Sequence, residues 1–174
     1  MKIFFIGYRG TGKTTIGKLL AHRLDFNFMD TDQLIEQLLE STIMEIIKTQ
    51  GWDKFRQIEK QTLLNTTKKE HTIIATGGGI IIDHGNQQFM NQNGFCIWLD
   101  ADINTILLRL QTDHINNRLR PALTQKSLLA ETSEMLKKRN PLYQNTAHIR
   151  IDTSFHTPEE IVNIIDRRLK DVWQ

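Results

Sequence analysis

Asp30 and Asp32 are the first residues of this 174-residue chain whose types and spacing could do chemistry. They lie one residue apart in the stretch Phe-Met-Asp-Thr-Asp-Gln-Leu, after an apolar run and before a helical pattern. Two such carboxylates can ligate a metal, act as a catalytic base, or cap the following helix. From this stretch alone, capping by Asp32 or Thr31 is the favoured interpretation. The rest of the chain decides between the three.

A phosphate-binding loop precedes the carboxylates. Residues 7–14, Gly-Tyr-Arg-Gly-Thr-Gly-Lys-Thr, match G-x-x-x-x-G-K-[ST] in full, between an expected strand and an expected helix. In this motif, backbone N–H groups and the helix N-terminus hold phosphate oxygens. Lys13 can reach the β- and γ-phosphates, and the Thr14 hydroxyl can ligate Mg²⁺. The motif predicts nucleoside triphosphate binding but leaves the phosphoryl acceptor open. We find no N-K-x-D run for guanine, which disfavours a GTPase.

Strand-like and helix-like segments alternate along the chain, which predicts an α/β fold with a mostly parallel sheet. The expected strands are Ile3–Ile6, Phe26–Met29, Thr72–Thr76, Phe95–Leu99 and His148–Ile151. The last helix has the clearest start, because Thr157, Pro158 and Glu160 form a capping box with proline at the first helical position. Ligands bind at the carboxyl ends of strands in such sheets. We therefore expect the phosphate loop, the carboxylates and the glycines at 77–79 to converge.

The composition favours one soluble domain with a full core. A formal net charge of +2 gives no general attraction to nucleic acid or membrane. No signal peptide or membrane span is recognised, so we expect a cytoplasmic protein. Cys96 is the only cysteine, and its apolar neighbours indicate core packing. No apolar helix face is left over, which favours a monomer. The segments 42–54 and 111–120 are interpreted as movable inserts.

Several further short motifs follow in order along the chain. They are Phe55-Arg56-x-x-Glu59, Gly77-Gly78-Gly79, Arg120-Pro121 and Arg139-x-Pro141-Leu142-Tyr143. Together with the phosphate loop and Asp30-Thr31-Asp32, this ordered set resembles the shikimate kinases of the nucleoside-monophosphate-kinase-like P-loop group. The motifs span residues 7–143, and their order is far more specific than any one of them.

The resemblance implies a three-layer P-loop kinase fold with a five-stranded parallel sheet in the order 2-3-1-4-5. It implies a single domain over residues 1–174, with a substrate-binding subdomain at about 33–60 and a lid at about 111–123. It implies transfer of the γ-phosphoryl group of Mg-ATP to the 3-hydroxyl of shikimate, in aromatic amino acid biosynthesis. ATP and shikimate are then the partners, and Mg²⁺ is the cofactor.

The resemblance also assigns roles to residues. ATP binding falls to Gly10, Thr11, Gly12, Lys13, Thr14, Thr15, Arg109 and Arg120. Shikimate binding falls to Asp32, Arg56, Gly77, Gly78, Gly79 and Arg139, because guanidinium forks suit a planar carboxylate. Thr14 and Asp30 are the metal-side residues. Asp32, Lys13 and Arg120 are the catalytic residues, with Asp32 taking the proton of the acceptor hydroxyl.

Some alternatives stay open at this point. Arg118 replaces Arg120 as the lid arginine if the register slips by two, and Arg150 competes with Arg109 for the adenine. An ion pair with Glu59 is the alternative role of Arg56. Trp52, Ala122 and Ile47 depart from the residues often found in the family and affect the shape of the pocket.

Rival functions are also weighed. A gluconate kinase would carry a histidine soon after the Asp-x-Asp pair, and residues 33–40 contain none. A nucleoside-monophosphate kinase would need to read a second base. A regulatory module without transfer activity would be expected to lose Asp32, Arg56 or Arg139.

Overall fold

A computed structural model of the chain describes residues 1–66, 69–112 and 127–172. The strands are β1 (Lys2–Ile6), β2 (Asn27–Asp30), β3 (Thr72–Ala75), β4 (Phe95–Asp100) and β5 (Ile149–Asp152). The helices are α1 (Lys13–Leu24), α2 (Thr31–Leu39), α3 (Ile43–Asn65), the short 3₁₀ helix η2 (Ile80–Ile82), α4 (His84–Asn93), α5 (Ile103–Thr112), α7 (Leu128–Thr146) and α8 (Pro158–Val172). All five expected strands are confirmed, with bounds that differ by about one residue.

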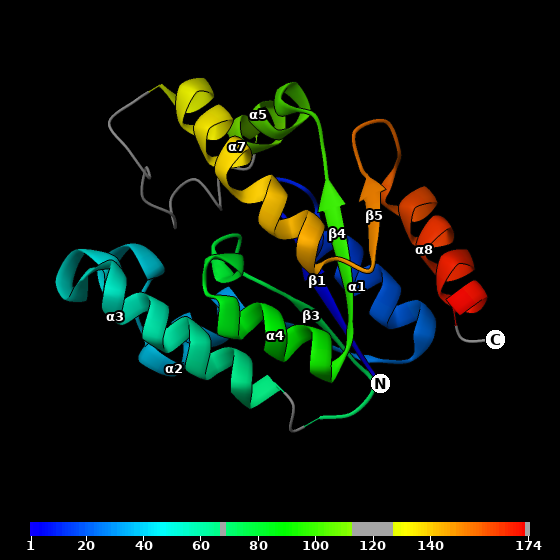
Figure 1. The fold of residues 1–174 in the computed structure, drawn as a ribbon, viewed down its shortest axis with the longest axis horizontal. Coiled ribbons are helices and arrows are strands. Elements are labelled where there is room, and N and C mark those ends of the chain that lie inside the picture. The colour runs from blue at the N-terminus through cyan, green and yellow to red at the C-terminus, as the bar shows by residue number, and fades with distance from the viewer. Residues whose placement is uncertain (67–68, 113–126, 173–174) are drawn as a thin grey trace.

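The strands form one parallel sheet in the order β2-β3-β1-β4-β5, as expected. Helices cover both faces of this sheet (Figure 1). α1 and α8 pack together on one face, while α4 and α7 contact β4 from the other. Because all strands run the same way, their carboxyl ends meet at one edge, where the loops can build a binding site.

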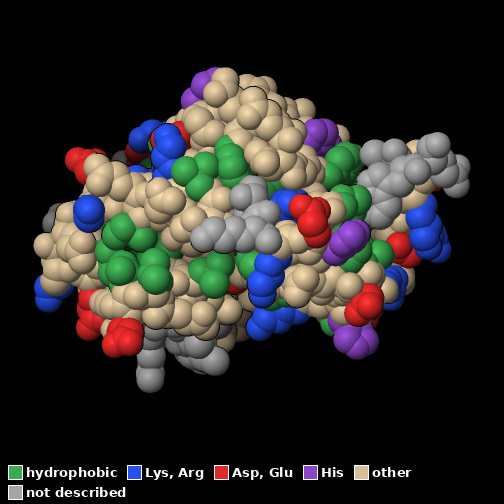
Figure 2. Space-filling model, turned by 90° about the horizontal axis from the view of Figure 1, so that it is seen from below, with side chains coloured by type: hydrophobic (Ala, Val, Ile, Leu, Met, Phe, Trp, Pro, Cys, Tyr) green, Lys and Arg blue, Asp and Glu red, His purple; other side chains and the backbone are tan. Residues whose placement is uncertain are grey.

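The surface carries charged and apolar side chains side by side. On the face drawn in Figure 2, hydrophobic side chains lie in several separate patches among lysines, arginines and acidic residues. Leu38 on α2 is 70% exposed and Leu108 on α5 is 62% exposed, so single apolar side chains of these helices face outward. Within the described ranges, no helix combines the length and the apolar character needed to cross a bilayer.

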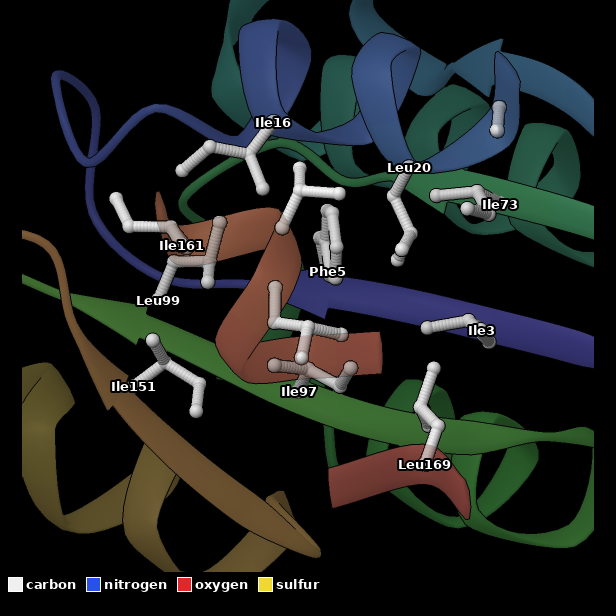
Figure 3. Packing of buried hydrophobic residues seen from close by; sticks show 13 residues of the cluster. Ile3, Phe5, Ile16, Leu20, Ile73, Ile97, Leu99, Ile151, Ile161 and Leu169 are labelled. Carbon is white, nitrogen blue, oxygen red and sulfur yellow. The ribbon is translucent and has the colours of Figure 1, made fainter. Parts of the chain in front are cut away.

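The core has two halves because successive side chains of a strand point to opposite faces. Ile3 and Phe5 of β1 pack on the side of α1 and α8, together with Ile161 and Leu169 (Figure 3). Phe4 belongs to the opposite half, with Cys96 and Tyr143, from β4 and α7. Cys96 is fully buried in this half of the core, which confirms that it is a packing residue, and burial raises the pKa of its thiol to about 12.

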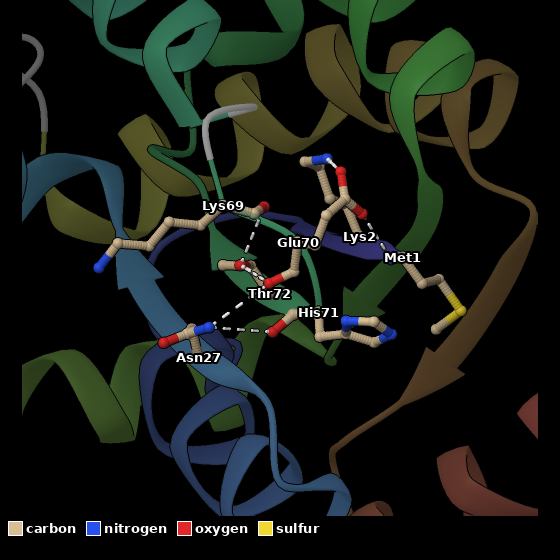
Figure 4. A network of polar contacts seen from close by, with 7 residues as sticks. All are labelled: Met1, Lys2, Asn27, Lys69, Glu70, His71 and Thr72. Atoms are coloured by element: carbon tan, nitrogen blue, oxygen red, sulfur yellow. Dashed lines mark hydrogen bonds and ion pairs between the residues drawn. The ribbon is translucent and has the colours of Figure 1, made fainter.

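Polar contacts join the amino ends of β1, β2 and β3, far from the carboxyl edge of the sheet. The N-terminal ammonium group of Met1 and the Lys2 Nζ each lie 2.9 Å from the Glu70 carboxylate (Figure 4). The Asn27 side chain donates to the carbonyl oxygens of Glu70 and His71 at 3.4 and 3.5 Å. These contacts join β1 and β2 to the segment leading into β3.

The segment 42–54 differs from its interpretation as an insert outside the core. It forms the first half of α3, and its residues Ile43 and Ile46 are buried with Phe55 and Ile35 in a small core of their own. The helix bends at Gly51, whose φ of 82° and ψ of 169° are non-helical. The first residues of the segment 111–120 belong to α5, which ends at Thr112. The rest of this segment lies outside the described residues.

Candidate active site

The phosphate loop joins β1 to α1 at the carboxyl edge of the sheet. α1 begins at Lys13, so the N-terminus of this helix points into the loop. The Lys13 Nζ donates to the carbonyl oxygens of Gly7 and Tyr8, at 2.9 and 2.7 Å. A cavity opens over the loop and is lined by most of the predicted ATP-binding residues, namely Gly10, Gly12, Lys13, Thr14, Thr15 and Arg109. Thr11 is buried beneath, and its hydroxyl donates to the Tyr8 carbonyl at 2.8 Å.

Asp30 caps α2, which corrects the prediction that Thr31 or Asp32 does so. Its Oδ1 accepts from the backbone N–H groups of Asp32 and Gln33, at 3.0 and 3.4 Å. Its Oδ2 accepts from the Thr14 hydroxyl at 2.7 Å. The reason is the strand boundary, since β2 extends through Asp30 and leaves this residue extended at the helix entrance. One carboxylate therefore serves both the helix and the phosphate loop.

Asp32 lies in the first turn of α2. Its carboxylate is buried, with 9% exposure, and lines the phosphate cavity. It also lines a second, smaller cavity, which contains Arg56, Gly77–Gly79 and Arg139. The sequence alone left the two carboxylates interchangeable. In the fold, Asp30 faces the phosphate loop and Asp32 lies between the two cavities.

Arg56 is held by contacts on several sides. Its Nη1 donates to the buried Glu59 carboxylate at 2.6 Å, so the ion pair weighed above is present within the cavity wall. The guanidinium carbon lies 5.3 Å from the ring centres of both Trp52 and Phe55. It also fills the space over Gly79, where an added Cβ would come within 2.2 Å of Nη2. Glycine at position 79 thus makes room for the arginine.

Glu59 is 1% exposed, and its environment is unusual for a carboxylate. Burial raises its pKa to about 7, and the nearby charge of Asp32 adds to the rise. Arg56 and Arg139 act in the opposite direction but do not cancel the effect of burial. Glu59 therefore holds a proton more readily than an ordinary glutamate, and Arg56 is joined to a group that titrates near neutral pH.

The glycine segment at 77–79 is organised by its carbonyl as well as by its N–H groups. Arg139 Nη1 and the Tyr143 hydroxyl donate to the Gly78 carbonyl, at 3.2 and 2.5 Å. The Gly77 N–H donates to the Thr31 hydroxyl at 3.0 Å. The Gly77 N–H is therefore already used within the protein, and shikimate binding by Gly77, Gly78 and Gly79 stays a prediction.

The remaining arginines separate clearly. Arg109 reaches Gly10 and Thr153, donating to the Thr153 carbonyl at 2.6 Å, so it lies at the rim of the phosphate cavity. Arg150 instead pairs with Asp100 at 2.6 Å and does not line that cavity, which argues against it as the adenine-side residue. Arg118 and Arg120 fall outside the described residues, so the predicted lid arginine stays a prediction.

Sequence reasoning missed several residues that line the cavities. His156, Pro158 and Ile161 line the phosphate cavity at the start of α8. Residue 7 of the phosphate loop and residue 158 of this helix are 151 positions apart along the chain. Arg9 lines both cavities. It stands at a variable position of the phosphate-loop motif, so the pattern assigns it no role. Its charge was the available signal.

The donors present fit a magnesium ion. The Thr14 hydroxyl and the Asp30 carboxylate are hard oxygen donors that both line the phosphate cavity, 2.7 Å apart. Within the described part of the chain, no three acidic, histidine or cysteine side chains cluster as a metal cage. Mg²⁺ does not require one, because it is usually bound by one or two protein oxygens together with phosphates and water.

A parallel sheet in this order, a phosphate loop after its first strand and an adjoining arginine-lined cavity define a P-loop kinase for a small molecule. The sequence model of the shikimate kinase family matches residues 9–170. The chain therefore belongs to the shikimate kinase family, whose members are ATP-dependent kinases.

Individual relatives agree with this assignment. Shikimate kinase 2 of Yersinia enterocolitica is 43% identical over 169 residues, which cover 97% of this chain and 95% of that protein. The structure of the Acinetobacter baumannii shikimate kinase in complex with shikimate has a TM-score of 0.90 at 30% identity and covers 98% of this chain and 93% of that one. The Bacteroides thetaiotaomicron shikimate kinase has a TM-score of 0.88 at 30% identity, with 98% of each chain covered.

Proposed function

We propose that this enzyme transfers the γ-phosphoryl group of Mg-ATP to the 3-hydroxyl of shikimate, which yields shikimate 3-phosphate and ADP. The observation that carries the proposal is the position of Asp32, a buried carboxylate that lines both the phosphate cavity and the arginine-lined cavity. A general base for phosphoryl transfer has to touch the acceptor hydroxyl while the donor lies within reach.

The smaller cavity suits a small hydroxylated carboxylic acid. Arg56 and Arg139 approach it from α3 and α7, and two guanidinium groups can bind a planar carboxylate through parallel hydrogen bonds. Glu59 fixes Arg56, and the Gly78 carbonyl fixes Arg139, so both forks are oriented before the acid arrives. Ile47 and Trp52 supply apolar wall for the ring. The helical segment at 33–60 is thus the substrate-binding part of the domain.

The reaction then follows from the placement of the side chains. The acceptor oxygen forms a bond to the γ-phosphorus as the bond to the bridging oxygen of ADP breaks, and the hydroxyl proton passes to Asp32. Lys13 neutralises charge on the phosphates, and the helix N-terminus at α1 adds partial positive charge. Positioning and electrostatics supply most of the acceleration in such a loose transition state.

Thr14 and Asp30 are the residues that would hold Mg²⁺, Thr14 through its hydroxyl and Asp30 through the water shell. When bound, the ion would neutralise negative charge on the phosphate groups. Arg109 lies beside the nucleotide at the cavity rim, and Arg120 is the lid arginine by family resemblance. We further propose that the enzyme works as a monomer in the cytoplasm, where ATP is available.

The direct test mixes the purified protein with Mg-ATP and shikimate and follows ADP release. We expect ADP formation that depends on shikimate and stops when shikimate is consumed. A panel with gluconate and nucleoside monophosphates as acceptors tests the rivals, and none of these should be turned over. If ADP release is no faster with shikimate than without it, the proposed function is wrong.

A further inference from the structure

Three side chains line both cavities, and they mark the passage through which a phosphoryl group must move. They are Arg9, Asp32 and Ile43. Asp32 carries negative charge into this passage and Ile43 is apolar. Arg9 is the one cation of the three. The phosphate-loop motif assigns it no role, because the motif allows any residue at this position.

Arg9 is partly buried, and its side chain is held in place by contacts. Its side chain is 14% exposed, and its Nη2 lies 2.5 Å from the Glu131 carboxylate, which is 2% exposed. Its guanidinium carbon also lies 5.7 Å from the centre of the Tyr8 ring. Glu131 is in the first turn of α7, the helix that carries Arg139 two turns later. The ion pair therefore joins the phosphate loop to the helix that reaches the second cavity.

The contacts leave part of the guanidinium available. Arginine has five N–H donors in a planar fork, and Glu131 accepts from one nitrogen of this fork. The Arg9 Nε is buried and finds no hydrogen-bond acceptor among the described residues. A buried donor without an acceptor costs free energy. Such a cost is understandable where a ligand oxygen completes the hydrogen bonding.

A purely structural role for the pair explains these observations less well. Replacing a buried ion pair by apolar residues is often neutral or stabilising, so stability alone is a weak reason for burying an arginine and a glutamate here. Arg9 lines both cavities together with the proposed base Asp32, and this position gives its charge a use. A preorganised cation in a site shielded from water stabilises charge that develops during transfer.

We propose that Arg9 is a further catalytic residue, which donates hydrogen bonds to the phosphoryl group as it crosses between the cavities, and that Glu131 is its positioning residue. This inference rests on the proposed function. In the step itself the acceptor oxygen bonds to the γ-phosphorus, the bond to the ADP oxygen breaks, and the hydroxyl proton goes to Asp32. Arg9 gains or loses no bond in this balance and acts only through charge and hydrogen bonds.

The test compares Arg9→Met, Glu131→Gln and the double variant with wild type. Arg9→Met removes the charge with little change in length, and we expect kcat to fall by about 10²- to 10³-fold, as for loss of one oriented donor. The KM for shikimate and the Kd for ATP should stay within about threefold of wild type, because the interaction forms in the transition state. Arg23→Met, which removes an exposed arginine of α1, is the matched control and should keep full turnover.

The Glu131→Gln variant tests whether Glu131 positions the Arg9 guanidinium or only stabilises the fold. The glutamine can still accept from Arg9, so kcat should fall by less than in Arg9→Met. The double variant should be no slower than Arg9→Met, since the two residues act as one unit. Added methylguanidinium should restore part of the turnover of Arg9→Ala, which a structural defect would not allow.

Several results would overturn the proposal. They are a kcat for Arg9→Met within threefold of wild type, a rise in the shikimate KM with kcat unchanged, or additive losses in the double variant. If Arg9→Met does not fold, Arg9→Lys keeps the charge and should fold but lose at least about tenfold in kcat, because an ammonium lacks the fork. Wild-type inactivity with shikimate would contradict the proposed function instead, and Arg9 would then be tested with whichever acceptor the panel identifies.

Discussion

At the scale of single residues, Asp30 and Asp32 differ in what their oxygens contact. The Asp30 carboxylate accepts hydrogen bonds from backbone N–H groups in the first turn of α2 and from the Thr14 hydroxyl, so it is fixed beside the phosphate loop. Asp32 lies two residues further along the chain, in the first turn of α2, and lines both cavities. This difference in position supports the proposed division into a metal-side carboxylate, Asp30, and an acceptor-side carboxylate, Asp32.

The role of Asp32 can be tested with Asp32→Asn. The change keeps the size of the side chain but removes the base, so we expect kcat to fall by about 10²- to 10⁴-fold, the usual contribution of general base catalysis. ATP should raise the unfolding temperature of the variant as much as that of wild type. Asp166→Asn on α8 is a matched control that should keep normal turnover. Near-normal turnover of Asp32→Asn would remove this residue from its proposed role.

Glu59 makes stability depend on pH in a direction opposite to that of most carboxylates. Burial raises its pKa from 4.5 to about 7 in the folded protein. Between these values the folded state holds a proton that the unfolded state has released, so the free energy of unfolding falls as pH rises. The loss is complete above about pH 7 and amounts to ~3 kcal/mol at most, from about 1.4 kcal/mol for each pKa unit.

Urea unfolding of wild type and Glu59→Gln between pH 5 and 8 checks this prediction. The glutamine cannot titrate, so the variant should gain stability relative to wild type as pH rises. Glu159→Gln, at an exposed position of α8, should track wild type across the whole range. Parallel curves for wild type and Glu59→Gln would mean that Glu59 does not change protonation in this window.

At the scale of elements, the shape of the smaller, arginine-lined cavity depends on the bend in α3. The first half of the helix packs Ile43 and Ile46 against α2, and the second half carries Arg56 and Glu59. Gly51 joins the halves with a backbone conformation that side-chain-bearing residues rarely adopt. No atom lies within 4 Å of where its Cβ would be, so the requirement for glycine is conformational rather than steric.

Gly51→Ala should therefore cost about 1–3 kcal/mol of stability, the usual cost of such a backbone conformation without glycine. If the helix straightens to avoid the strain, Arg56 moves and the KM for shikimate rises while ATP binding is unchanged. Urea unfolding and steady-state kinetics measure the two effects. Gln50→Ala, at the neighbouring exposed position, should change neither. A fully stable and active Gly51→Ala would show that the bend is not required.

At the scale of the whole molecule, two half-cores hold the parallel sheet from both faces and bring distant segments to one edge. The phosphate loop follows β1, the carboxylates end β2, and the glycine segment follows β3. β3 lies between β2 and β1, so these loops are neighbours although about 70 positions separate residues 7 and 77. α7 adds Arg139 from the other side of the sheet.

Binding of the nucleotide and metal should be visible in global stability. Mg-ATP at one hundred times its Kd is expected to add about 2.7 kcal/mol to the free energy of unfolding. EDTA should abolish turnover and reduce this stabilisation, and excess Mg²⁺ should restore both. Lys13→Met tests whether the effect belongs to the phosphate loop, since this variant should gain much less stability from Mg-ATP. Turnover that continues undiminished in EDTA would contradict the metal role of Thr14 and Asp30.

The sequence by itself predicted the strands, a mostly parallel sheet and the set of motifs, because apolar strands and a complete phosphate loop are local patterns that do not depend on the details of packing. The strand order was predicted only through the resemblance to the family. The sequence also led to the resemblance that the comparisons confirmed. It failed at strand ends, where a shift of one residue made Asp30 rather than Asp32 or Thr31 the cap of α2. Local patterns cannot resolve such a shift, since all three residues are good caps.

Only the tertiary structure decided which residues share a cavity. Arg9 and Glu131 are 122 positions apart, and neither belongs to a pattern that links them. The same holds for Gly79, where an added Cβ would come within 2.2 Å of Arg56 Nη2. The raised pKa of Glu59 likewise arises from burial among Asp32, Arg56 and Arg139. These properties depend on distance and on the exclusion of water, which the order of residues along the chain does not contain.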